Sequence, residues 1–297
     1  MHQFFQATVF GLLQGGLLAL VAVGFSLVWG VMNVINLGHG ALAVTGAYVA
    51  WLLNTHFGLD PFATLPVVAV CLFGLGYLIQ RFLINLIVNA PIFLTLILTY
   101  GLGLLITSTL QIVFTANDQQ LLSAHGYALQ PFEVGGIALP VGLMIAFGTA
   151  VLVTVALALT MGRTRLGQAI SATGMDRGAA RLMGIRVRHI YALTFAIAAA
   201  LAGVAGAMWG TIGTFNPTDL PITLTFDAFV VSVLGGLGNM YGALVGGLVL
   251  GVAQSLGGLY LHGTWVDAIG MGVLLLTLLI RPSGLIGSPY FAGRAEA

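Results

Sequence analysis

Lysine is absent from this chain of 297 residues, and all nine of its basic residues are arginine. A phosphate-binding loop of the GxxxxGK[ST] type needs a lysine that reaches the phosphates, so the chain cannot contain one. Catalysis through a lysine Schiff base is excluded for the same reason. The single cysteine, Cys71, cannot form an intramolecular disulfide or a thiolate metal cluster, and its apolar neighbours predict a small buried side chain. We therefore expect no catalytic residue, no metal ligand and no cofactor on this chain.

Charge of either sign is scarce. Only 6% of the residues are charged, whereas a soluble globular chain carries about 25%. Hydrophobic residues make up 59% of the sequence, and the mean hydropathy is +1.07. A net charge of +1 leaves no electrostatic footprint for nucleic acid. The composition predicts that lipid surrounds most of the protein.

The apolar runs predict an all-α, polytopic transmembrane helix bundle that forms a single domain over residues 1–297. An ordinary crossing needs about 20 residues, and the runs give about 8–9 membrane segments. We place these segments at 7–31, 40–53, 62–80, 91–114, 139–161, 189–210, 224–237, 241–257 and 266–280. Three of them, 40–53, 224–237 and 266–280, are short, which indicates broken or re-entrant helices.

Arginine sets the expected orientation. Six arginines fall between two predicted segments, in a loop at about 162–188, and the positive-inside rule makes that loop cytoplasmic. Counting crossings outward from it places Arg81, Arg281 and Arg294 inside as well. The N-terminus is then outside and the C-terminus inside. No basic residue precedes the first apolar run, so we interpret that run as a retained helix and not a signal peptide. The stretch 116–137 is expected to be an outside surface loop.

Two predicted segments are interrupted by glycines that have asparagine beside them. In transporters, such breaks are the best sequence indication of the transport path. The candidate path residues are Asn33, Asn36, His39, Asn239 and Tyr241. Side-chain amides can bind a zwitterionic or amide solute, but asparagine at a break more often caps a helix end. A packed, hydrogen-bonded histidine is likewise the commoner role for His39, so both interpretations stay open.

The arginine-rich loop predicts a short amphipathic helix at 175–183. Asp176 would lie in its first turn, where a carboxylate suits the helix dipole, and Gly184 would end it. Arg177 and Arg181 are i, i+4 neighbours on one face. The apolar face would carry Met175, Ala179, Leu182 and Met183. Such a helix fits either a loop that only fixes topology or a docking site for a soluble partner.

Several stretches resemble the permeases of branched-chain amino acid ABC importers, the hydrophobic amino acid uptake group. They are Gly-Leu-Leu-Gln-Gly-Gly-Leu-Leu-Ala-Leu (11–20), Asn-Val-Ile-Asn-Leu-Gly-His-Gly (33–40) and Val-Leu-Gly-Gly-Leu-Gly-Asn-Met-Tyr-Gly-Ala-Leu-Val-Gly-Gly (233–247). The stretch 177–185 resembles the ATPase-docking loop of such permeases, with its Glu-Ala-Ala…Gly pattern, although Gly178 stands where the acid is usual. The resemblance implies that docking involves Asp176, Arg177, Ala179, Ala180, Arg181, Leu182, Met183 and Gly184.

The same resemblance implies a transporter subunit that is not an enzyme, in the inner membrane of a bacterial cell. Its implied partners are a second homologous permease, two cytoplasmic ABC ATPases that hold ATP and Mg²⁺, and a periplasmic solute-binding protein. The implied solutes are branched-chain amino acids or, as in relatives, urea, short amides and aromatic acids.

Two other functions remain compatible with the sequence. One is an ion-coupled secondary carrier, because such carriers often hold an ionisable residue inside the membrane and Asp227 falls within a predicted segment. The other is a membrane assembly subunit that transports nothing. The sequence does not select the solute, nor does it decide between a pore of two identical permeases and one of two different permeases.

Overall fold

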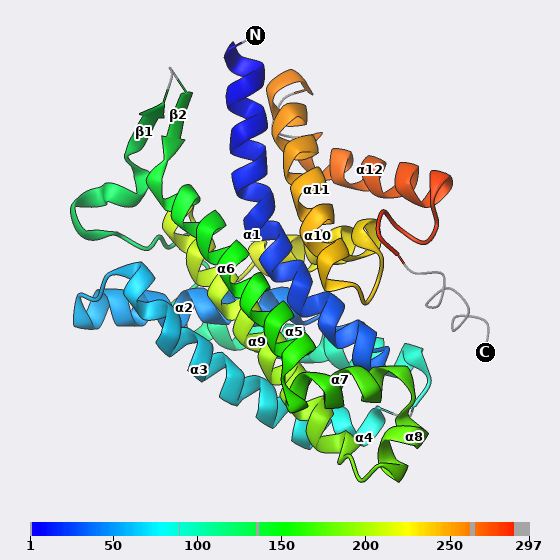
Figure 1. Cartoon of the computed structure of the whole chain (residues 1–297). Helices are drawn as coiled ribbons and strands as arrows, with labels where there is room; N and C mark the ends of the chain where they lie inside the picture. The colour runs from blue at the N-terminus through cyan, green and yellow to red at the C-terminus, as the bar shows by residue number, and fades with distance from the viewer. Residues whose placement is uncertain (1, 89, 135–136, 262–264, 288–297) are drawn as a thin grey trace.

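The computed structural model describes residues 2–88, 90–134, 137–261 and 265–287, so the tail that contains Arg294 lies outside the described residues. The fold is all-α apart from one hairpin (Figure 1). Its helices are α1 (His2–Met32), α2 (His39–Phe57), α3 (Pro61–Ile79), α4 (Asn85–Ile87), α5 (Ile92–Phe114), α6 (Val141–Arg163), α7 (Arg165–Met175), α8 (Arg177–Leu182), α9 (Val187–Ile212), α10 (Leu220–Gly235), α11 (Met240–Leu261) and α12 (Val266–Ile280). A π-helical turn, Gln80–Ile84, joins α3 to α4, and a 3₁₀ helix, Ala124–Leu129, precedes the antiparallel strands β1 (Pro131–Val134) and β2 (Ile137–Pro140).

Within the described residues, six helical stretches are long and apolar enough to cross a membrane. They are His2–Met32, Pro61–Ile87, Ile92–Phe114, Val141–Arg163, Val187–Ile212 and Met240–Leu261. Two shorter apolar helices, Leu220–Gly235 and Ala268–Ile280, accompany them. These helices confirm the predicted polytopic membrane bundle.

Helix α2 corrects the prediction of a short segment at 40–53. The helix continues to Phe57 and has 19 residues, or about 28 Å at 1.5 Å per residue. It ends at Gly58, whose φ of 64° is left-handed and whose N–H donates to the Asn54 carbonyl at 3.0 Å. The polar residues Asn54, Thr55 and His56 therefore continue the helix, and Gly58 terminates it as a C-cap.

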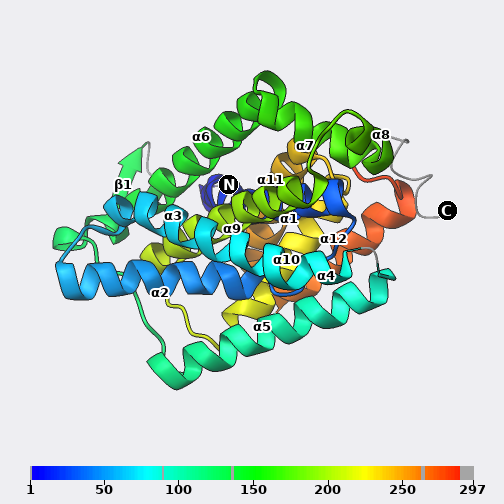
Figure 2. The ribbon, with the colours of Figure 1, turned by 90° about the horizontal axis from the view of Figure 1, so that it is seen from below.

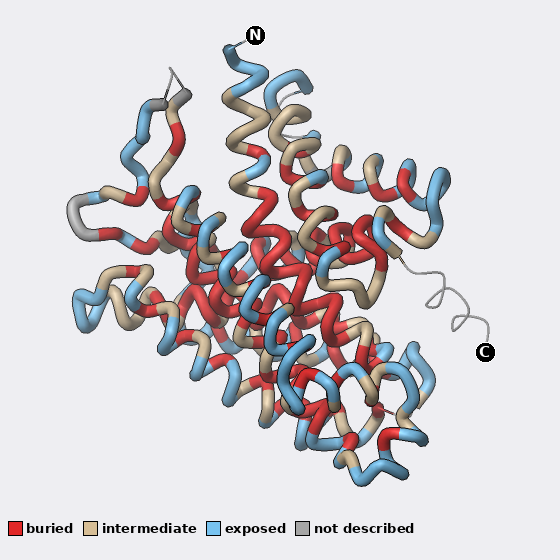
Figure 3. The backbone as a smooth tube through the Cα atoms, viewed as in Figure 1, coloured by how far each residue is buried: buried red, intermediate tan, exposed pale blue. Residues whose placement is uncertain are grey.

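Helix α1 forms the centre of the molecule. It packs against α6, α9, α10 and α11, while α9 also packs against α2 and α3. The buried residues gather along α1, α9 and the first half of α2, as Figure 3 shows. Seen from below, α2 and α6 lie on opposite sides of α9 (Figure 2).

Helix α3 contributes only one face to this core. Its buried positions include Thr64, Val68, Leu72 and Gly76, four residues apart. Cys71 lies beside this buried stripe and is exposed, so the prediction of a buried cysteine is wrong. An apolar run does not by itself distinguish a side chain that faces protein from one that faces lipid.

Helices α1 and α11 touch through glycines. A Cβ atom built on Gly11 would lie 2.7 Å from the Gly251 carbonyl oxygen, and one on Gly15 would lie 2.6 Å from the Gly247 carbonyl oxygen. Both distances are too short for a side chain. The glycine pairs spaced four residues apart in 11–15 and 247–251 therefore pack two helices of the same chain together.

Several arginines and several acids lie at opposite ends of the bundle, although Asp176 lies among the arginines and Asp227 lies within α10. Helix α3 begins after Asp60 and leads to Arg81, and α6 begins after Glu133 and ends at Arg163. We call these the acidic end and the arginine end. The stretch 116–137, predicted to be a surface loop, lies at the acidic end and folds into the 3₁₀ helix and the hairpin there. The N-terminus lies at the acidic end, and α7 and α8 lie at the arginine end (Figure 1).

Candidate functional site

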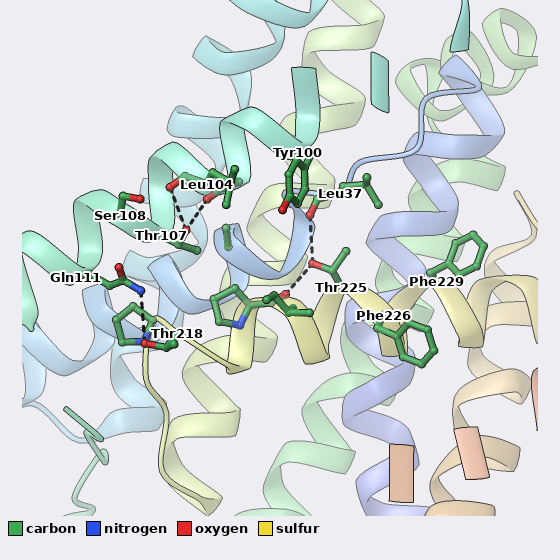
Figure 4. A pocket seen from close by; sticks show the side chains of 15 residues that line it. Leu37, Tyr100, Leu104, Thr107, Ser108, Gln111, Thr218, Thr225, Phe226 and Phe229 are labelled. Carbon is green, nitrogen blue, oxygen red and sulfur yellow. Dashed lines mark hydrogen bonds between the residues drawn. The ribbon is translucent and has the colours of Figure 1, made fainter. Parts of the chain in front are cut away.

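A cavity of about 440 Å³ lies between the start of α2, the middle of α5 and the first half of α10. Figure 4 shows its walls. Its lining residues are Leu37, Ala41, Tyr100, Gly103, Leu104, Thr107, Ser108, Gln111, Pro217, Thr218, Pro221, Ile222, Thr225, Phe226 and Phe229. None of these residues is charged. The lining is mostly apolar, with a few hydroxyl and amide groups that can orient a ligand, which is the usual character of a small-molecule site.

The polar groups of the cavity are concentrated toward one side. Ser108, Thr107, Gln111 and Thr218 lie together in Figure 4, away from Phe226 and Phe229. Gln111 Nε2 donates to Thr218 Oγ1 at 3.4 Å, which links α5 to the loop before α10. The cavity can therefore receive a solute that has one polar end and one apolar end.

The break between α1 and α2, residues 33–38, forms part of the cavity wall. Two threonine hydroxyls from neighbouring helices hold it. Thr99 Oγ1 of α5 donates to the Ile35 carbonyl at 3.0 Å and accepts from the Leu37 N–H at 3.3 Å. Thr225 Oγ1 of α10 accepts from the Gly40 N–H at 2.9 Å. Because the first N–H groups of a helix have no intrahelical partner, these hydroxyls act as caps supplied by other helices.

The predicted path residues of this break shape the backbone and do not line the cavity. Asn33 has a left-handed φ of 54° and ends α1, its N–H donating to the Trp29 carbonyl. Asn36 is 1% exposed, and its Oδ1 accepts from the Gly38 N–H at 3.1 Å. His39 is fully buried, and its Nε2 donates to the Val21 carbonyl at 3.0 Å. These contacts are those of helix caps and a packed histidine.

The two later path residues lie at the arginine end, also outside the cavity lining. Asn239 Oδ1 accepts from the N–H groups of Tyr241 and Gly242 and so caps α11. Its Nδ2 donates to the Ile286 carbonyl at 2.8 Å, which fastens the segment after α12. Tyr241 is exposed. The glycine break at 235–238 is therefore a packed corner in this conformation.

The helix predicted at 175–183 is present as α8, although it is shorter and Met175 belongs to α7. Helix α7 ends at Met175 and α8 starts at Arg177, with Asp176 extended between them at φ −151° and ψ 114°. Asp176 Oδ1 accepts from the N–H groups of Gly178 and Ala179 at 2.7 and 3.1 Å. Aspartate is among the strongest N-capping residues, and Asp176 caps the start of α8, close to its predicted place in the first turn.

Gly184 ends α8 as predicted. Its φ is 80°, its N–H donates to the Arg181 carbonyl, and the Ile185 N–H donates to the Ala180 carbonyl, both at 3.0 Å. We call the end of α7 together with α8, residues 174–185, the docking segment.

The apolar side chains of the docking segment are unusually exposed. Leu182 is 90% exposed, and Met183 and Met175 are also exposed, at the end of the molecule where charge is positive. Ala179 and Arg181 are exposed as well. Ala180 differs, because its methyl group is buried inside the chain.

The sequence profile described as "Branched-chain amino acid transport system / permease component" matches residues 7–279. The chain belongs to this permease family. It is 30% identical over 97% of both chains to BraD of Pseudomonas aeruginosa, a high-affinity branched-chain amino acid transport system permease protein. It is 29% identical over 96% of both chains to the corresponding LivH protein of Escherichia coli K12. The LivM protein of the same strain is 25% identical over 90% of this chain and 67% of its own length. The permease is accordingly a multi-pass protein of the inner membrane.

Arg177, one of the residues for which the resemblance implies a docking role, contacts other helices of the permease. It is half-buried, and its Nη2 donates to the Met32 carbonyl at the end of α1 at 2.7 Å. Its guanidinium also lies over the Tyr191 ring of α9, 5.6 Å from the centroid. The side chain is thus engaged with its own chain and is not free for a partner.

The cavity residues of the permease escaped the sequence reasoning, although α5 carries a signal for them. Small or polar residues recur every fourth position along this apolar helix, at 95, 99, 103, 107 and 111. Such spacing forms one stripe on a helix. Of these, Thr95, Thr99 and Gly103 are buried, and positions 103, 107 and 111 line the cavity.

Proposed function

We propose that this permease is the membrane-spanning subunit of an ATP-driven importer of branched-chain amino acids or related small solutes. The related solutes that we propose are urea, short amides and aromatic acids. The observation that carries it is the cavity between α2, α5 and α10, which has no charged lining residue. Burying an aliphatic side chain there is worth about 1.5–3 kcal/mol, whereas a charged side chain would lose its hydration without gaining a partner.

The docking segment supports a cytoplasmic partner. Exposed Leu182 and Met183 on a short helix suit a hydrophobic groove on a soluble protein. We assign this groove to each of two ABC ATPases, which hold ATP and Mg²⁺. A second homologous permease and a periplasmic solute-binding protein complete the complex. The arginine end is then cytoplasmic and the N-terminus is outside.

The test of transport is leucine uptake into proteoliposomes that contain the permease, its homologous partner, the two ATPases and the binding protein. We expect uptake that requires ATP and disappears when the ATPases carry a substitution of the P-loop lysine. Uptake that persists with those inactive ATPases would contradict the proposal.

The docking assignment has a separate test. Leu182→Asp places a charge on a side chain that is 90% exposed, so the fold is preserved while the groove contact is lost. We expect ATPase binding to weaken by about 30-fold, the effect of losing a hot-spot side chain of about 2 kcal/mol. Leu122→Asp, an exposed position at the acidic end, is the matched control. Equal ATPase co-purification with both variants would refute the assignment.

One observation favours a different function, an ion-coupled carrier. Asp227 is buried within α10, where its Oδ1 accepts from Gln254 Nε2 of α11 at 3.1 Å. An acid inside a membrane protein is a functional candidate by default. This alternative predicts uptake driven by a proton gradient in vesicles that contain no ATPase, and loss of that uptake in Asp227→Asn.

A further inference from the structure

Arg177 joins the docking segment to the end of α1. Its Nη2 lies 2.7 Å from the Met32 carbonyl oxygen, a short distance typical of a charge-assisted hydrogen bond. Met32 and Tyr191, its two partners, are each 1% exposed. The arginine therefore reaches from the surface of α8 into the interior.

The carbonyl groups at the end of α1 require a hydrogen-bond donor from outside the helix. The last carbonyls of a helix have no intrahelical partner, and the helix dipole makes that end negative. The left-handed φ of Asn33 turns the chain away immediately after Met32. The guanidinium satisfies the carbonyl and the dipole together, and the Tyr191 ring holds it from the other side through a cation–π contact.

A second contact places α7 against the same end of α1. A Cβ atom built on Gly174 would lie 2.9 Å from the Gly30 carbonyl oxygen, so the two backbones touch there. Asp176, the residue beside Arg177, caps α8. The two helices of the docking segment are thus fastened to residues 30–32 by contacts that flank their junction.

The same end of α1 leads directly into the cavity wall. Leu37, which lines the cavity, follows Met32 by five positions. Between them the chain is bound to α5 through Thr99, and just beyond them it is bound to α10 through Thr225. A displacement of residues 30–32 therefore pulls on a segment tied to two walls of the cavity.

We propose that Arg177 is the positioning residue through which a movement of the docking segment changes the cavity, and this inference rests on the function proposed above. When an ATPase displaces α8, the guanidinium carries the end of α1 with it. The break at 33–38 then shifts against Thr99 and Thr225. Arg177 itself contacts neither the solute nor the ATPase.

A purely structural cap predicts a different result. Loss of a cap lowers the stability of the chain, but every assembled complex still moves the same amount of solute for each ATP hydrolysed. Loss of a transmitting residue leaves ATP hydrolysis in place and lowers the number of solutes moved per ATP. The ratio of uptake to hydrolysis separates the two roles.

The experiment compares Arg177→Met, Arg177→Lys and a control, Arg165→Met, in proteoliposomes containing the whole complex. Arg165 is an exposed arginine of α7, so its removal changes the net charge equally. We expect all three to retain the ATPases. The leucine-to-ATP ratio should fall about tenfold in Arg177→Met, a coupling free energy within the usual range. Arg177→Lys should restore part of the ratio, and Arg165→Met should keep the wild-type value.

Other outcomes overturn the proposal in recognisable ways. An unchanged ratio in Arg177→Met, or an equal fall in Arg165→Met, would exclude a transmitting role. Loss of the ATPases from Arg177→Met would make the arginine a docking residue instead. Absence of ATP-driven uptake by the wild-type complex would refute the proposed function and not this inference.

A second measurement guards against misfolding of Arg177→Met. Leu37→Cys in a Cys71→Ser background places one thiol in the cavity wall. Its rate of labelling by a water-soluble maleimide should change when ATP is added to the complex. In Arg177→Lys the change should shrink, and an undiminished change would contradict the inference.

Discussion

Replacing Thr225 by valine tests whether a hydroxyl from α10 holds the start of α2 at the cavity. Valine keeps the shape of threonine and removes only the hydrogen-bonding oxygen. In the native chain that oxygen accepts from the Gly40 N–H at 2.9 Å and donates to the Pro221 carbonyl at 2.7 Å. Gly40 is buried, so water cannot replace the lost partner.

The magnitude follows from the group that loses its partner. A buried N–H without an acceptor costs about 1–3 kcal/mol. That cost lowers the ratio of folded to unfolded protein by about 5- to 150-fold. The Pro221 carbonyl contributes little further, because it belongs to the first turn of α10 and can accept from its own helix.

The assay is unfolding of the purified permease in sodium dodecyl sulphate, followed by circular dichroism. Thr223→Val is the matched control, because the Thr223 hydroxyl donates only to the Asp219 carbonyl of its own helix end. We expect Thr225→Val to unfold at a clearly lower detergent fraction than Thr223→Val. Equal midpoints would show that the hydroxyl does not hold the break and would refute the reasoning.

Two further changes test the packing and the acidic end. Gly206→Ala should prevent stable folding, because the added Cβ would overlap the Ala43 carbonyl. The control Gly74→Ala should fold normally, because a Cβ there meets no neighbouring atom. The yield of monodisperse protein in detergent measures both outcomes. Burial and the hydrogen bond to Asp60 raise the pKa of Tyr127 from 10.0 to about 12. A raised pKa means that the folded chain keeps the proton longer than the unfolded chain, so this stabilisation is complete below pH 10 and is lost between pH 10 and about 12. Tyr127→Phe should remove that pH dependence from the unfolding midpoint, and an unchanged pH dependence would contradict the assignment.

Hydropathy predicted the helices well, because every segment that crosses lipid must be apolar over about 20 residues. The predicted segment at 91–114 matches α5, and the one at 266–280 matches α12. Where the prediction failed, a local cap decided the outcome. Helix α2 continues to the glycine at 58, and the cap at Asp176 makes α8 start at Arg177 and not at Met175.

The site was harder to predict, because side-chain direction is a property of the assembled bundle. The asparagines in the glycine breaks were predicted to be candidate path residues, yet Asn36 and Asn239 cap backbone groups. Thr99 and Thr225 lie inside apolar runs, and the sequence pattern predicted no role for them. Only the packing of α5 and α10 against α2 makes their hydroxyls partners of the break.

The threonine and asparagine caps at the start of α2 have a consequence for flux. The N–H groups of Leu37, Gly38 and Gly40 already donate to Thr99, Asn36 and Thr225, so these three N–H groups are not available to bind a carboxylate. With no charged lining residue either, the cavity presents a shallow energy well to a zwitterion. A shallow well suits passage, because a solute that binds weakly also leaves quickly. An arginine engineered into this wall would therefore slow transport, because the solute would bind more tightly and leave more slowly.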